Sequence, residues 1–139
     1  MQVGKIMDKK LLIVTNNKII NDTMSEKSIF IDICFSESSS IDVFNISKSR
    51  IRDGYILLTH PFRGAIEPLE QPFKSLILKE GGDAIDFDSL KLINHCIMRF
   101  RKAISERPAN LWTKKDLTDF AKVDVIIIER WLRKVYYKQ

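Results

Sequence analysis

The sequence predicts an α/β fold: a small, mostly parallel sheet of about four strands, flanked by helices and completed by a C-terminal helical pair. Three observations lead to this prediction. Over the first 60 residues, apolar runs of strand length alternate with segments of helical periodicity, a pattern typical of parallel sheets. The last third of the chain is helical and amphipathic. With 139 residues, 45% of them hydrophobic, the chain suits a single domain over residues 1–139.

The first half of the chain predicts the order strand, helix, strand, helix, strand. The polar residues 1–9 are expected to be a disordered or extended lead, and the continuous apolar run at 11–15 is typical of a strand covered on both faces. A short helix over 18–27 and a strand over 28–35 follow. Apolar residues at helical spacing then predict a helix that stops at Gly54, and the third strand, "YILLT", begins directly after it.

The second half adds one strand and the remaining helices. Residues 74–79 predict a fourth strand whose direction stays open; an antiparallel pair at the sheet edge is favoured, because no helix pattern separates this strand from the third. A clear amphipathic stripe predicts a long helix over 87–105, and "ERPAN" ends it because proline removes a donor. Residues 113–139 predict a helical extension in two pieces that packs on the domain or on a partner.

Composition restricts the setting and the chemistry. No apolar run approaches the roughly 20 residues that span a bilayer, and no apolar signal segment follows the polar start, so a cytoplasmic location is expected. Cys34 and Cys96 lack the spacing of a zinc site or a disulfide framework and are expected to be buried thiols. The signatures GxGxxG, Walker A, HExxH and GxSxG are absent, so neither a metal nor a cofactor is predicted.

The basic charge is concentrated at the C-terminal end. Residues 99–139 hold 11 Lys and Arg against 5 Asp and Glu, whereas residues 1–98 hold 12 against 13. This charge fits either an anionic partner or a solvated helix face. The segment "KKDLTDFAKVDVIIIERWLRK" brings a DNA-binding helix-turn-helix to mind. However, Lys122 replaces the usual turn glycine, and aliphatic residues begin the would-be recognition helix, so nucleic acid is not the expected partner.

The last helical segment is apolar around much of its circumference, and this surplus predicts burial in the chain or against a second copy. A homodimer would use Val125, Ile128, Trp131 and Leu132.

Candidate binding residues lie where the predicted strands end. Asn16 and Asn17 leave the first strand, and Thr59 and His60 leave the third. Ligands of open parallel sheets bind beyond the carboxyl ends of the strands, so these residues converge if the two strands are neighbours. The long, proline-rich loop after the third strand could close over the same region. Its candidate residues are Arg63, Gly64, Lys74 and Ser75. Such a set could hold a carboxylate or a phosphate. Alternatively, these residues have only a structural role, because their side chains hydrogen-bond to backbone groups where strands end and the chain turns.

His60 is the candidate catalytic residue. A catalytic histidine needs a neighbouring nucleophile or an orienting carboxylate, and the spacing of the sequence shows neither. An enzyme would use His60 together with Asn17, Thr59, Arg63 and Lys74. The alternative is a structural or ligand-binding histidine.

Three stretches resemble the GrdX family: "KLLIVTNN", "DVFNISKSRIRDGYILLTHPFRGAIEPLEQPFKS" and "LTDFAKVDVII". The resemblance covers about residues 10–130, and its most specific part is 59–75, although Phe62 and Arg63 depart from the family pattern. It implies a protein encoded beside the glycine, sarcosine and betaine reductase genes of anaerobic, amino-acid-fermenting bacteria. Those reductases are selenoenzymes that work with thioredoxin and yield acetyl phosphate. The resemblance implies this context and no mechanism.

The first functional hypothesis is therefore a non-catalytic accessory or regulatory protein of this reductase system. It would bind a protein partner, such as a reductase component, or a small anionic metabolite. The alternatives are a small enzyme centred on His60 and a DNA-binding regulator that uses the basic C-terminal helices.

Overall fold

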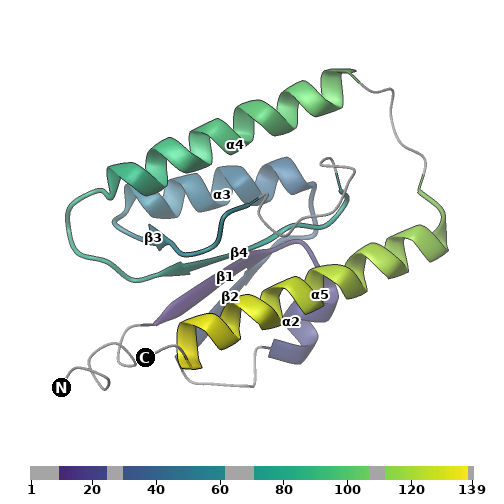
Figure 1. Ribbon diagram of the computed structural model, residues 1–139, viewed down its shortest axis with the longest axis horizontal. Coiled ribbons are helices and arrows are strands. Elements are labelled where there is room, and N and C mark those ends of the chain that lie inside the picture. Colours follow the sequence, from purple (N-terminus) through teal and green to yellow (C-terminus); the bar gives the residue numbers. More distant parts are fainter. Residues whose placement is uncertain (1–9, 25–29, 62–70, 107–111, 138–139) are drawn as a thin grey trace.

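The computed structural model describes residues 10–24, 30–61, 71–106 and 112–137 (Figure 1). Within these ranges the strands are β1 (Leu11–Thr15), β2 (Ile31–Phe35), β3 (Ile56–Leu57) and β4 (Ser75–Lys79). The helices are α2 (Lys18–Met24), α3 (Ser40–Arg52), α4 (Phe87–Glu106) and α5 (Lys114–Tyr137). The predicted α/β class, the four strands and the flanking helices are confirmed, whereas the expected lead at residues 1–9 lies outside the described residues.

The sheet is mixed, so the prediction of a mostly parallel sheet is wrong. The strand order is β2-β1-β4-β3; β1 and β2 pair in parallel, whereas β4 runs antiparallel to both of its neighbours. The chain leaves β3 and enters β4 at the same end of the sheet, so β4 must run back against β3. The predicted antiparallel direction therefore holds, but β4 is a central strand. It is buried along most of its length, which suits the centre of a sheet, and the two-residue β3 forms the edge.

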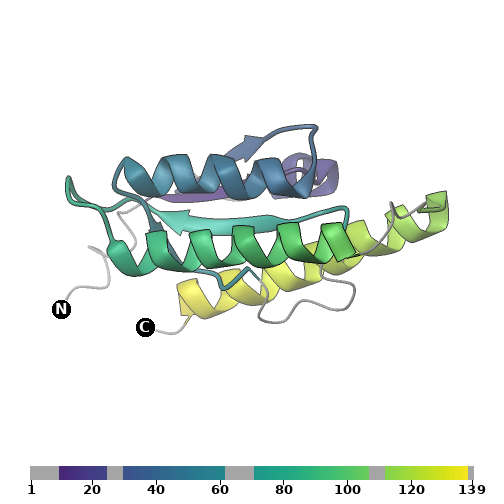
Figure 2. The same cartoon turned by 90° about the horizontal axis from the view of Figure 1, so that it is seen from above.

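Helices cover both faces of the sheet. Helices α3 and α4 pack on one face, where they bury Leu12 and Val14 of β1, and Figure 2 shows these two helices side by side. Helices α2 and α5 pack on the other face, where they bury Leu11 and Ile13 (Figure 1). This alternation is the two-residue period of a strand with a core on each side. It explains why both faces of β1 are apolar.

The C-terminal segment is one continuous helix and not two pieces. Helix α5 spans 24 residues, and its sequence contains neither Gly nor Pro, so nothing interrupts its ladder of backbone hydrogen bonds. The turn that a helix-turn-helix needs near Lys122 is absent, and that interpretation of the segment is wrong. None of the helices in the described ranges is long and apolar enough to cross a membrane.

The apolar face of α5 covers the sheet of its own chain. Ile128 is only 1% exposed, and Val125, Trp131 and Leu132 pack against the same core. These are the four residues predicted to form a homodimer. A second copy could reach only the partly buried members of the set, because Ile128 already fills the core. Helix α5 thus packs on the sheet of its own chain.

Candidate binding site at the carboxyl edge of the sheet

The predicted site residues that the structure describes lie along one edge of the sheet. Asn16 and Asn17 follow β1, and Thr59 and His60 follow β3. The strands β1 and β3 are not neighbours as the prediction required, because β4 lies between them. However, β4 is antiparallel, so Lys74 and Ser75 at its start reach the same edge. Arg63 and Gly64 lie outside the described residues.

Asn16 connects two loops at this edge. Its amide nitrogen Nδ2 donates to the carbonyl oxygens of Ser38 and Pro72, both at 2.9 Å. The backbone N–H of Lys74 donates to Asn16 Oδ1, also at 2.9 Å. Because both amide protons are used inside the protein, Asn16 orders the edge and has no N–H left for a ligand.

Thr59 also has a structural partner, because the backbone N–H of Ile77 donates to Thr59 Oγ1 at 3.2 Å. The geometry of Asn16 and Thr59 therefore fits a structural role, in which their side chains hydrogen-bond to backbone groups near the ends of strands.

A buried cluster of hydrogen-bonded side chains, formed by Asn17, Ser75 and Asp124, connects α5 to this edge of the sheet. Ser75 Oγ donates to Asp124 Oδ2 at 2.6 Å, and Asn17 Nδ2 donates to the same oxygen at 3.0 Å. Asn17 Nδ2 also donates to the carbonyl of Ala121 at 2.9 Å, while Asn17 Oδ1 accepts from Ile19 N at the start of α2. One asparagine thus joins β1, α2 and α5.

The hydroxyl of Thr15 extends this cluster. The Thr15 and Ser75 hydroxyl oxygens are 2.6 Å apart, and the Ser75 proton is already given to Asp124, so Thr15 is the donor.

Two ionisable groups are buried at this edge, Asp124 at 8% exposure and Lys74 at 5%. Burial raises the pKa of the Asp124 carboxyl, and the hydrogen bonds from Ser75 and Asn17 oppose this rise. Burial also lowers the pKa of Lys74 to about 8, against the opposing attraction of Asp124. The Lys74 ammonium Nζ donates to the carbonyl of Pro61 at 3.4 Å. For both groups, burial makes the ionised form less stable than it would be in water.

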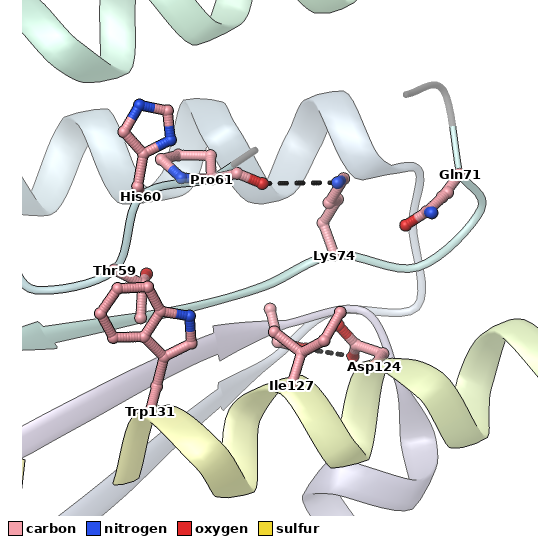
Figure 3. Close-up of a pocket in the computed structure, with 9 residues that line it drawn as sticks. Thr59, His60, Pro61, Gln71, Lys74, Asp124, Ile127 and Trp131 are labelled. Atoms are coloured by element: carbon pink, nitrogen blue, oxygen red, sulfur yellow. Dashed lines mark hydrogen bonds between the residues drawn. The ribbon is translucent and has the colours of Figure 1, made fainter. Parts of the chain in front are cut away.

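A small cavity lies beside His60, between β4 and α5 (Figure 3). Its lining includes Lys74, Asp124 and Trp131, but its volume is about 20 Å³. Such a space holds about one water molecule and is too small for a substrate. In Figure 3 the His60 ring is turned away from Asp124, so this carboxylate does not orient it. The geometry therefore does not favour a catalytic centre at His60.

A much larger groove, of about 520 Å³, opens at the carboxyl ends of β1 and β2. Its walls come from the start of α2, the loop after β2, Phe73 in the segment that leads into β4, and the first half of α5. The lining residues are Asn16, Asn17, Lys18, Ile19, Phe35, Glu37, Ser38, Phe73, Leu117, Thr118 and Ala121. The parallel strands β1 and β2 lead into helices on opposite faces of the sheet, which makes this a topological switch point, the usual ligand position in open α/β sheets.

A comparison with protein-family models decides the relationship of the chain. The model described as GrdX-like protein matches residues 12–133, which is most of the sequence. The chain belongs to the GrdX-like family. No curated protein and no solved structure shows a significant match.

Sequence reasoning missed two parts of the site in this GrdX-like chain. Asp124 was not among the predicted site residues, although an acidic residue inside the apolar run around Val125 was a signal that it needed a buried partner. The groove residues Phe35, Phe73 and Leu117 were not predicted either. They come from distant segments, and only the adjacency of β1 and β2 brings them together.

The GrdX-like chain offers no evident metal centre in its described part, where no group of three or more His, Cys, Asp or Glu side chains could hold an ion. Burial raises the pKa of the Cys96 thiol to about 11, which makes it a poor nucleophile at neutral pH.

Proposed function

We propose that this GrdX-like protein is an accessory or regulatory protein of the glycine and betaine reductase system, and that it acts by binding and not by catalysis. Its ligand is a small anionic metabolite held in the groove, or a reductase component docked over it. The proposal includes a cytoplasmic location in amino-acid-fermenting cells.

The position and size of the groove carry this proposal. Ligand sites in proteins are concave, mostly apolar and about 300–1,000 Å³ in volume, and the groove of about 520 Å³ falls within that range. It lies at the switch point of the parallel strand pair, where rigid strand ends hold its floor. Lys18 at its mouth supplies a positive charge for an anionic ligand. By contrast, the cavity beside His60 has room for only one water.

A thermal-shift screen tests the metabolite form of the proposal. Glycine, sarcosine, betaine, acetyl phosphate and nucleotides would each be added to the wild-type protein. A ligand at 100 times its Kd stabilises the folded state by about 2.7 kcal/mol, which raises Tm by several degrees. The variant Thr118→Trp places a large side chain in the groove from an exposed position, and its matched control, Lys122→Trp, carries the same change one helical turn away.

The expected result is a Tm increase in wild type and Lys122→Trp that Thr118→Trp loses. A His60→Ala variant should keep the shift, because His60 does not line the groove. If His60→Ala loses the Tm increase and Thr118→Trp keeps it, the ligand does not bind in the groove. This result would instead support the alternative of a small enzyme centred on His60. If no compound stabilises the protein, the metabolite form fails. The protein-partner form is then tested by gel filtration with purified reductase components, where Thr118→Trp should block co-elution and Lys122→Trp should not.

A further inference from the structure

The walls of the groove are apolar and come from four separate elements. Ile19 of α2, Phe35 at the end of β2, Phe73 before β4 and Leu117 of α5 all line it. Ile19 keeps 37% of its surface exposed, although most large apolar side chains of this domain are covered. Apolar surface that converges from several elements gains free energy when a ligand covers it. The body of the ligand is therefore apolar.

Most polar side chains of the floor are already engaged within the protein, whereas the buried hydroxyl of Ser38 has no hydrogen-bond partner among the described residues. Both amide protons of Asn16 and both of Asn17 are donated to protein acceptors. The hydroxyl of Thr118 donates to the carbonyl of Lys114 at 3.0 Å. A phosphate needs several donors at once, and of these side chains only Ser38 keeps one, its single hydroxyl. A phosphorylated ligand is consequently a poor match for the floor of the groove.

Charged side chains of opposite sign stand at the mouth of the groove. Lys18, at the start of α2, and Glu37, in the loop after β2, both line it and attract each other. The ammonium of Lys18 also lies 2.8 Å from Asp22 Oδ2, which uses one of its three donors and leaves two. The carboxylate of Glu37 accepts hydrogen bonds and donates none. The mouth thus offers a donor for a carboxylate and an acceptor for an ammonium group.

From this arrangement we infer that the groove binds a free amino acid with an apolar side chain. Its carboxylate lies against Lys18, its ammonium against Glu37, and its side chain between Ile19, Phe35, Phe73 and Leu117. This inference rests on the metabolite form of the proposed function and changes its ligand from a net anion to a zwitterion, whose carboxylate is accompanied by an ammonium and an apolar body.

The two kinds of contact contribute differently to affinity. Burial of a leucine-sized side chain contributes roughly a tenfold to hundredfold gain in affinity over glycine. Ion pairs at an exposed rim contribute less, and removal of either ligand charge should weaken binding by roughly twofold to fivefold. The side chain therefore supplies most of the affinity, and the rim charges supply the preference for a zwitterion.

Isothermal titration calorimetry on the full chain tests the inference with four ligands. L-Leucine carries every required group, glycine lacks the side chain, 4-methylpentanoate lacks the ammonium and 3-methylbutylamine lacks the carboxylate. Glu37→Gln should remove the preference for leucine over 4-methylpentanoate, and Lys18→Gln should remove the preference over 3-methylbutylamine. Asp83→Asn and Lys122→Gln are matched controls, because they change exposed charges that do not line the groove.

Leucine binding at least tenfold tighter than glycine, with both preferences lost in the matching variants, supports the inference. The inference is overturned if leucine binds no tighter than glycine. It is also overturned if Glu37→Gln still prefers leucine over 4-methylpentanoate. If sarcosine or acetyl phosphate binds and leucine does not, the proposed function stands and this inference falls. If none of these compounds binds, the metabolite form of the proposed function falls together with the inference.

Discussion

Lys74 lies almost completely inside the protein, and its replacement by methionine should stabilise the fold at neutral pH. Methionine has a similar length and is apolar, so Lys74→Met keeps most of the packing while it removes the buried charge. The attraction to Asp124 and the hydrogen bond to Pro61 do not repay the cost of burial, because the net effect of the site is a pKa lowered to about 8.

The size of the effect follows from that pKa. The ordinary value is 10.5, so the shift to about 8 corresponds to 2.5 pH units, or about 3 kcal/mol at 1.36 kcal/mol per unit. Between pH 8 and pH 10.5 the unfolded chain binds more protons than the folded one, so the wild-type protein gains stability as the pH rises through this window. Below pH 8 Lys74 is charged in both states, so the full destabilisation from its buried charge is present. The advantage of Lys74→Met should thus fall from about 3 kcal/mol at pH 7 to about 1 kcal/mol at pH 10.

Urea unfolding followed by circular dichroism at pH 7 and pH 10 measures this difference. Cys96 titrates in an overlapping window with the opposite sign: its pKa is raised to about 11, so its contribution to stability is lost between about pH 9 and pH 11. Both proteins contain Cys96, so the effect of its burial cancels in the difference, and only its attraction to Lys74, the smallest cause in both pKa shifts, does not. Lys91→Met, at an exposed position of α4, is the control and should change stability little at either pH. A Lys74→Met variant that is less stable than wild type at pH 7, or an advantage that is equal at both pH values, would refute the reasoning.

Three further predictions concern how the elements are held together. Asp124→Ala removes the acceptor of the Ser75 hydroxyl and should cost about 1–3 kcal/mol, with faster hydrogen exchange in α5 than in α4; equal exchange in both helices would contradict the role of Asp124 as the fastener of α5. Gly54→Ala should cost about 1–3 kcal/mol in urea unfolding, because Gly54 has φ +107° and an added Cβ would collide with the carbonyl of Gly82; an unchanged midpoint would show that this turn relaxes freely. Ile128→Ala should cost about 2–5 kcal/mol, whereas Ile126→Ala, at 49% exposure on the same helix, should cost less than about 1 kcal/mol, and equal losses would argue against the observed orientation of α5.

The positions of the helices and strands could be predicted because they depend on local patterns. The apolar run that forms β1 and the amphipathic stripe that forms α4 each carry their own periodicity. Gly54 was predicted as a helix stop, and it does follow the end of α3 with a positive φ that other residues rarely adopt. Prediction failed inside 113–139, where a break was expected although the sequence contains no residue that stops a helix.

The strand order could not be predicted, because it depends on contacts between distant segments. Both faces of β1 and β4 are apolar, which suits central strands, but the pattern does not say which strands lie beside them, and β4 was expected at the edge of the sheet. In the structure β4 lies between β1 and β3. This position also decided that Lys74 and Ser75 would lie at the same edge as Asn16.

The candidate site shows the same division. The sequence by itself pointed to the carboxyl edge of the sheet, because polar residues that follow apolar strands are local signals, and most of the predicted residues do lie there. Only the tertiary structure decided their roles: the hydrogen-bonding groups of Asn16 and Asn17 are used inside the protein, and the open surface is an apolar groove completed by α5. Helix α5 is distant in sequence from β1, and its approach depends on the buried contacts of Ile128 and Asp124. A groove exists only where separate elements meet, so its composition follows from packing and not from any one segment.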